Sequence, residues 1–157
     1  MGTDPTADEL RVLLDKQAIT EVLHRYCIAI DGKDRELGYS VWHPDGLAKY
    51  EGMFDGTGRE FIDFGISGHE TSLPASSHQL TNVVIDVDGD RATSTSYVTA
   101  VSTMAGSDLK YTIRGRYNDT WSRRGGVWAI DERRFATDIW DIGQLGHDLM
   151  QMPESQS

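Results

Sequence analysis

The fold is decided by residues 78–140, which read HQLTNVVIDVDGDRATSTSYVTAVSTMAGSDLKYTIRGRYNDTWSRRGGVWAIDERRFATDIW. This stretch is rich in Val, Ile, Thr, Tyr and Trp, the residues that favour extended backbone. The turn sequences Asp88-Gly89-Asp90, Ala105-Gly106-Ser107 and Arg124-Gly125-Gly126 divide it into the runs 78–89, 91–104, 109–123 and 127–140. Such turns between β-rich runs are hairpin signals, so the segment predicts a four-stranded antiparallel meander.

A long helix is expected before this meander. Residues 10–30 carry apolar side chains at three- and four-residue steps, the pattern of a helix with one buried face. The apolar positions are Leu10, Leu13, Leu14, Ala18, Val22, Tyr26 and Ile30, with Asp15 among the polar residues elsewhere on the turn. Asp4-Pro5-Thr6 offers a cap at the start of this helix, and Gly32 offers a left-handed exit at its end.

Three shorter elements are expected between this helix and the meander. Residues 33–42 form a short helix that His43-Pro44 ends, residues 45–53 form a strand, and residues 58–66 form another helix. Helices followed by antiparallel strands predict an α+β fold, with the helices gathered on one face of a strongly curved sheet. A sheet bent around a long helix gives a cone-shaped barrel, and its wide end is the natural place for an internal pocket.

Length and composition limit the function classes. The 157 residues support one domain, with a flexible N-terminus over 1–7, a barrel over 8–140 and a C-terminal tail over 141–157. A formal net charge of −10 argues against a nucleic-acid or anionic-membrane partner, because phosphate contacts need clustered Lys and Arg. The single Cys27 excludes an intramolecular disulfide and a Cys-based zinc site. An acidic, polar N-terminus and the lack of a long apolar run predict a cytoplasmic domain.

Asp31 and Tyr26 are the first candidates for chemistry. Asp31 closes the first helix, where the helix dipole disfavours a carboxylate, so its side chain either points into solvent or serves a cationic group. Tyr26 lies five residues earlier, about a turn and a half, so both side chains can approach one cavity mouth.

His78 is the next candidate, because it opens the first strand of the meander. Leu80, Asn82 and Val84 share its face, which is inward if those apolar residues point inward. A lone inward histidine is often a hydrogen-bonded core residue, whereas a histidine with an acidic partner can be a general base. The five histidines show no grouping with metal-ligand spacing, so no metal site is expected.

Two further features are ambiguous from the sequence alone. Arg133 and Arg134 are adjacent near the end of the last strand and must point to opposite faces, so one of them is a cavity candidate. Trp42 is either a core or rim aromatic or a residue that stacks on an aryl ligand.

Several motifs together resemble the SnoaL-like group of the nuclear-transport-factor-2-like superfamily. They are ITEVLHRY (19–26) with AID (29–31), SHQLTN (77–82), VDGDRA (87–92) with Tyr97, YNDTW (117–121) and GVWAIDER (126–133). The resemblance covers residues 8–140. The most similar-looking members are scytalone dehydratase, bile-acid 7-alpha-dehydratase and hexachlorocyclohexane dehydrochlorinase, which are cofactor-free elimination lyases with a His–Asp dyad in the cone.

The resemblance implies roles for five catalytic residues. His78 is the dyad histidine, Asp31 its partner, and Tyr26 and Tyr50 the pocket phenols. The basic residue of the last strand falls on Arg133. The expected substrate-binding residues are Asn82, Trp42 and Tyr97. The second histidine of scytalone dehydratase has no evident counterpart in these motifs.

The His78–Asp31 pair and the family resemblance together imply a cofactor-independent lyase in the catabolism of aromatic compounds. Its substrate is a hydrophobic, aromatic or polycyclic hydroxylated molecule that loses water, or that is cleaved at a carbon–carbon bond to release formaldehyde. Two alternatives stay open: an isomerase or cyclase of the ketosteroid-isomerase or polyketide-cyclase kind, and the non-catalytic small subunit of a ring-hydroxylating dioxygenase. The resemblance also implies a homotrimer without metal or cofactor.

Overall fold

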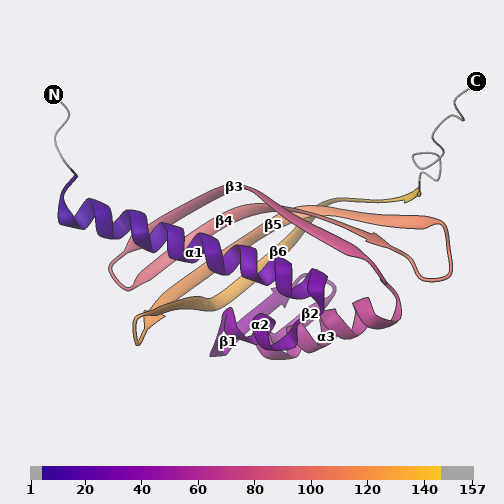
Figure 1. Ribbon diagram of the computed structural model, residues 1–157, viewed down its shortest axis with the longest axis horizontal. Coiled ribbons are helices and arrows are strands. Elements are labelled where there is room, and N and C mark those ends of the chain that lie inside the picture. The colour runs from indigo at the N-terminus through magenta and orange to yellow at the C-terminus, as the bar shows by residue number, and fades with distance from the viewer. Residues whose placement is uncertain (1–4, 146–157) are drawn as a thin grey trace, which may run out of the picture.

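The computed structural model describes residues 5–145, and over these residues three helices pack on one six-stranded sheet. The elements in chain order are α1 (Ala7–Gly32), α2 (Arg35–Ser40), β1 (Trp42–Tyr50), β2 (Phe54–Thr57), α3 (Gly58–Thr71), β3 (Ser76–Asp88), β4 (Arg91–Thr103), β5 (Leu109–Arg124) and β6 (Val127–Gln144) (Figure 1). The predicted α+β class is confirmed. None of these helices is long and apolar enough to cross a membrane.

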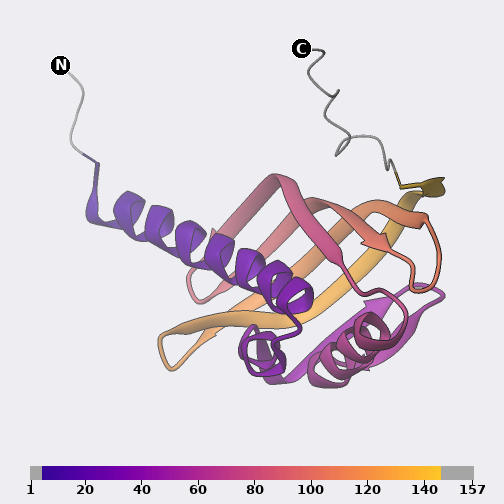
Figure 2. The same ribbon diagram turned by 45° about the vertical axis from the view of Figure 1, so that its right-hand side comes forward.

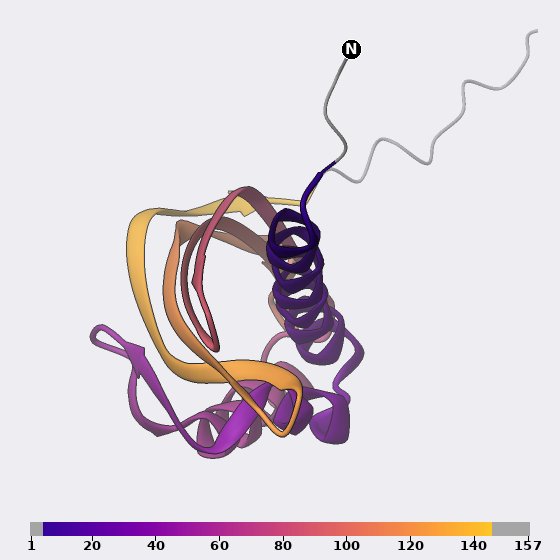
Figure 3. The same ribbon diagram turned by 90° about the vertical axis from the view of Figure 1, so that its left-hand side faces the viewer.

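The predicted meander forms one half of the sheet. The strand order is β2-β1-β6-β5-β4-β3, and the pairs β3–β4, β4–β5 and β5–β6 are antiparallel. The other half of the sheet was not predicted. There, β1 pairs in parallel with β6, and β2 pairs with β1 as the edge strand. The sheet curls without closing, and α1 lies across the open side of the curl (Figure 3).

Helix α1 begins and ends on local signals. Thr6 and Glu9 form a reciprocal capping box at its start. At its end, Lys33 takes the left-handed conformation, with φ 58°, that was expected of Gly32.

The predicted apolar face of α1 is correct only in its second half, where Val22, Tyr26 and Ile30 are buried. Leu10, Leu13 and Leu14 are exposed, because the first turns of α1 reach past the sheet (Figure 2).

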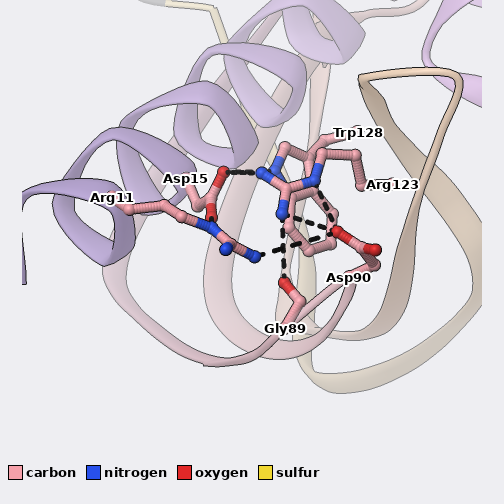
Figure 4. A network of polar contacts seen from close by, with 6 residues as sticks. All are labelled: Arg11, Asp15, Gly89, Asp90, Arg123 and Trp128. Atoms are coloured by element: carbon pink, nitrogen blue, oxygen red, sulfur yellow. Dashed lines mark hydrogen bonds and ion pairs between the residues drawn. The ribbon is translucent and has the colours of Figure 1, made fainter. Parts of the chain in front are cut away.

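Asp15, expected on the polar face of α1, is buried and holds the helix to two hairpins (Figure 4). Arg123 Nη1 donates to its carboxylate at 2.7 Å, and Trp128 Nε1 donates at 2.9 Å. Arg123 also donates to Asp90 in the β3–β4 turn, with Nη2 at 2.6 Å and Nε at 2.8 Å. The first half of α1 is therefore fixed to the β3–β4 and β5–β6 hairpins.

A bulge in β3 changes which side chains face inward. Asn82 has φ 50°, and the pairing with β4 shifts between Thr81 and Val84. The inward set is His78 and Leu80 before the bulge, and Val83, Ile85 and Val87 after it. The expectation of one unbroken face through Asn82 and Val84 is therefore wrong, and Val84 is 61% exposed.

Helix α3 and strand β6 are both longer than predicted. The buried positions of α3 continue from Phe61, Ile62 and Ile66 to His69, and the helix ends at Thr71 rather than residue 66. Strand β6 continues to Gln144, so residues 141–144 belong to the sheet rather than to the expected tail. Residues 146–157 of that tail, and residues 1–4 of the expected flexible N-terminus, lie outside the described residues.

Candidate active site

A cavity of about 360 Å³ lies between the inner face of the sheet and helices α1 and α3. Its wall is mostly aliphatic and aromatic, with two histidines, four tyrosines and one serine as the polar groups. The lining residues are Tyr26, Ile30, Tyr50, Met53, Phe61, Phe64, Gly65, Gly68, His69, Leu73, His78, Val98, Ala100, Ser102, Tyr111, Ile113, Tyr117 and Phe135. An apolar cavity of this size with a few convergent polar groups is typical of a small-molecule site.

His78 and Asp31 meet at the wall of this cavity. Asp31 is in the last turn of α1 and His78 near the start of β3, and His78 Nδ1 lies 2.6 Å from Asp31 Oδ1. The backbone N–H of His78 donates to Asp31 Oδ2 at 2.8 Å. Both side chains are largely shielded, with 11% of His78 and 26% of Asp31 exposed.

The hydrogen bonds around Asp31 keep it ionised. Burial raises its pKa, but the side-chain and backbone donors of His78 and the Ser76 hydroxyl outweigh burial and hold the pKa below its usual value. An ionised carboxylate only accepts hydrogen bonds, so His78 Nδ1 carries the proton. In the neutral imidazole, His78 Nε2 then presents the lone pair that a general base requires.

Three tyrosines that line the same cavity, Tyr26, Tyr50 and Tyr117, form a layer of phenols. Tyr26 and Tyr50 hydroxyls lie 2.9 Å apart, and the Tyr26 and Tyr117 rings pack edge to face. Burial raises the pKa of all three tyrosines well above 10, more than the positive charge of Arg133 lowers it. The phenols therefore stay protonated at neutral pH and serve as hydrogen-bond donors rather than as bases.

Arg133, and not Arg134, points inward, but it does not reach the cavity wall. Its side chain is fully buried, and it pairs with Asp119 through Nε at 2.8 Å and Nη2 at 2.7 Å. The guanidinium carbon lies 3.9 Å from the ring centre of Tyr117 and 4.4 Å from that of Tyr26. Arg133 thus contacts the rings of Tyr26 and Tyr117 rather than the cavity, so its predicted place as a cavity residue is corrected.

The three expected substrate-binding residues lie away from this cavity. Trp42 is 4% exposed and packs on Gly58, where an added Cβ would lie 2.1 Å from the indole. Asn82 is exposed because the bulge in β3 turns it outward. Tyr97 is 45% exposed, because the residues of β4 that face the core are Ser96 and Val98. All three are withdrawn from the site.

His69 and Ser76 belong to the site and were missed from the sequence. Ser76 Oγ donates to Asp31 Oδ1 at 2.9 Å and lies 3.0 Å from His69 Nδ1. The imidazole rings of His69 and His78 are nearly parallel, with centres 5.9 Å apart. The signal for His69 is its place in α3, because it continues the buried positions Ile62 and Ile66 at helical spacing.

The described part of the chain holds no group of three or more His, Cys, Asp or Glu side chains arranged to bind a metal ion. The polar groups of the cavity are instead arranged as proton acceptors and hydrogen-bond donors. This arrangement suits proton transfer to and from a bound small molecule.

Comparison with known proteins defines the class. The family model for the SnoaL-like domain matches residues 11–134, so this chain belongs to the SnoaL-like domain family. The resemblance found in the sequence motifs is thereby confirmed. No curated protein sequence matches the chain.

Solved structures share the fold across most of the chain. A provisionally assigned scytalone dehydratase from Novosphingobium aromaticivorans is 25% identical, with a TM-score of 0.75 over 82% of this chain and 87% of that one. LinA is 22% identical, with a TM-score of 0.78 over 88% and 94%. The hexachlorocyclohexane dehydrochlorinase LinA-type3 from Novosphingobium barchaimii is 19% identical, with a TM-score of 0.77 over 85% and 93%. The neighbours thus include a dehydratase-type protein and a dehydrochlorinase.

Proposed function

We propose that the protein is a cofactor-independent lyase acting on a hydrophobic, hydroxylated small molecule. The observation that carries this proposal is the 2.6 Å contact between His78 Nδ1 and Asp31 Oδ1 at the wall of an apolar cavity. The elimination lyases named among the structural neighbours support the same reaction class.

In the proposed reaction, His78 first acts as a base and then as an acid. Its Nε2 takes a proton from a carbon of the substrate, the electrons of that C–H bond form the new double bond, and the bond to the leaving oxygen breaks. The imidazolium returns the proton to the departing oxygen, which leaves as water. Asp31 holds the tautomer and stabilises the imidazolium while it exists.

The tyrosine pair supports the leaving oxygen. Tyr26 and Tyr50 are protonated, buried and linked at 2.9 Å, so a phenolic hydrogen can be donated toward negative charge that develops on the substrate. Arg133 lies behind this layer and makes that donation more favourable, because its charge stabilises a polarised phenol.

The cavity favours an aromatic or polycyclic substrate. Phe61, Phe64 and Phe135 contribute to a wall that offers much apolar surface and few polar groups. A close variant of the reaction uses the same base on a hydroxyl hydrogen. The carbon–carbon bond next to that hydroxyl then breaks, formaldehyde leaves, and the released electrons expel a second oxygen, which takes the proton from His78.

Two other functions predict different observations. An isomerase or cyclase would change the structure of the substrate without changing its mass. The small subunit of a ring-hydroxylating dioxygenase would bind a large partner chain and would not need the dyad.

The decisive experiment is mass spectrometry of the purified protein incubated with a panel of hydroxylated diaryl, steroid and polyketide-like compounds. One arm contains a metal chelator, and another contains His78→Ala. The proposal expects a product lighter by one water, or by formaldehyde and water, in the wild type and in the chelator arm, and no product from His78→Ala. A product of unchanged mass would contradict a lyase, and activity that requires a metal would contradict cofactor independence.

We further propose that the protein is a cytoplasmic homotrimer. Large exposed apolar side chains support self-association, since Leu14 is 68% and Trp140 is 61% exposed. Light scattering after size-exclusion chromatography is expected to give three times the mass of one chain.

A further inference from the structure

Asp31 organises two imidazoles rather than one. His78 bonds to the carboxylate directly, while His69 reaches it through Ser76 Oγ, which lies 3.0 Å from His69 Nδ1 and 2.9 Å from Asp31 Oδ1. The two rings are inclined by only 21°, with centres 5.9 Å apart. Both histidines line the same cavity.

The hydrogens that link Asp31, Ser76 and His69 have one consistent arrangement. Asp31 is ionised and only accepts, so the single hydrogen of the Ser76 hydroxyl points to Asp31. Ser76 Oγ then accepts from His69, and His69 Nδ1 must carry the hydrogen. The other ring nitrogen of His69, Nε2, is left with a lone pair.

His69 Nε2 is open to a ligand. It has no hydrogen-bond partner among residues 5–145, and it is not one of the sealed, unpartnered polar atoms of that part of the chain. Burial, followed by the neighbouring His78, lowers the pKa of His69, so the ring is neutral at neutral pH. Nothing in the lyase reaction proposed above uses this lone pair.

We infer that His69 Nε2 is a specificity site that accepts a hydrogen bond from a second hydroxyl group of the substrate. This inference rests on the proposed function and narrows its substrate class. The substrate is an apolar molecule that carries, beside the oxygen that leaves, another hydroxyl within reach of the second imidazole. A site built around a buried acceptor discriminates against an analogue that lacks the hydroxyl, because the acceptor is then left unpaired.

The first test needs no substrate and does not depend on the lyase proposal. Nitrogen NMR of the full-length protein at neutral pH identifies which ring nitrogen of His69 carries the hydrogen. The wild type is expected to be protonated at Nδ1, and Ser76→Ala is expected to shift the population toward the Nε2-protonated tautomer. Ser77→Ala, on the opposite face of β3, is the matched control and leaves the tautomer unchanged. A wild-type His69 that carries its hydrogen on Nε2, or on both nitrogens, would overturn the inference.

The second test measures recognition of a hydroxyl by binding alone, with styrene glycol and its monomethyl ether as probes. The wild type is expected to bind the glycol roughly five- to tenfold more tightly than the ether, as one neutral hydrogen bond provides. His69→Phe is expected to remove this preference, and His24→Phe, at an exposed position of α1, to preserve it. Equal binding of the two probes by the wild type, or a preference that survives in His69→Phe, would overturn the inference even if lyase turnover is found.

Discussion

His69 links stability to pH, because its environment suits only the neutral imidazole. Burial lowers its pKa in the folded protein below the ordinary value of about 6.5. Between these two values the unfolded chain binds more protons, so the free energy of unfolding falls as pH decreases below about 6.5. Chemical denaturation between neutral pH and pH of about 5 is expected to show a shallower decline for His69→Gln than for the wild type. Matched slopes in the two proteins would show that His69 does not contribute, and His24→Gln is the exposed control.

Arg133 contributes through a charge pair that has no access to water. Replacing it with Met leaves Asp119 buried without its partner, which is expected to cost about 3–5 kcal/mol of unfolding free energy. Arg134→Met at the next, exposed position is expected to change stability by less than about 0.5 kcal/mol. Denaturant unfolding of the two variants distinguishes them, and similar losses would contradict the structural role given to Arg133.

The sequence predicted the central residues of the candidate site but not their surroundings. Asp31, Tyr26 and His78 could be predicted because helix spacing and strand position bring them toward one cavity. Asn82 was wrongly predicted to face the cavity. One residue in the left-handed conformation reverses which side chains of a strand face inward, and no local sequence pattern indicates where this occurs. His69 was missed because its link to Asp31 through Ser76 joins α3, β3 and α1, and the end of α1 meets the other two only in the tertiary fold.

The bulge in β3 is the element on which the position of His78 depends. It lets His78 face the cavity while Ile85, further along the same strand, still faces the core. Asn82→Gly should keep or increase stability, since glycine adopts φ 50° freely.

Asn82→Val should instead lower the free energy of unfolding by about 1–2 kcal/mol, because a β-branched residue resists the left-handed region. Gln79→Val, at an exposed position of the same strand, is the control for adding a valine. Equal stability of the glycine and valine variants at position 82 would show that the left-handed conformation is not maintained in solution.

Helix α1 depends on Asp15 for its attachment to the hairpins. Asp15→Ala removes the acceptor of Arg123 and of the buried Trp128 Nε1, which is expected to cost about 2–3 kcal/mol in denaturant unfolding. Asp8→Ala, on the exposed first turn, is expected to cost only a few tenths of a kcal/mol through the helix dipole. A small effect of Asp15→Ala would mean that apolar packing alone holds the helix.

The elements were predicted as well as their local signals allow. The turns between the four meander strands have clear hairpin sequences, and the predicted antiparallel pairing is confirmed. The parallel pairing of β1 with β6 joins residues 85 to 88 positions apart in the sequence, and no local pattern encodes it. The position of Asp15 in the helix pattern predicts a surface residue. Its partners Arg123 and Trp128 are distant in the sequence, so its burial could not be predicted.

In the folded protein, a series of hydrogen bonds from His78 through Asp31 and Ser76 to His69 lies at the edge of an apolar cavity. The curl of the sheet brings β3, at one edge, over the end of α1, and this contact unites His78 with Asp31 (Figure 1). Helix α3 closes the other side and supplies His69. The curved sheet could be predicted from the order of helices and strands, whereas the two-histidine arrangement depends on how three separate elements meet.

The role of His78 as general base is tested by comparing turnover by His78→Gln with that by the wild type, on a compound from which the wild type removes water or formaldehyde. The change is expected to lower kcat by roughly 10²–10⁴-fold, the usual contribution of a general base, while circular dichroism shows an unchanged fold. His24→Gln is expected to retain wild-type kcat. A folded His78→Gln protein that turns over at the wild-type rate would show that His78 is not the general base.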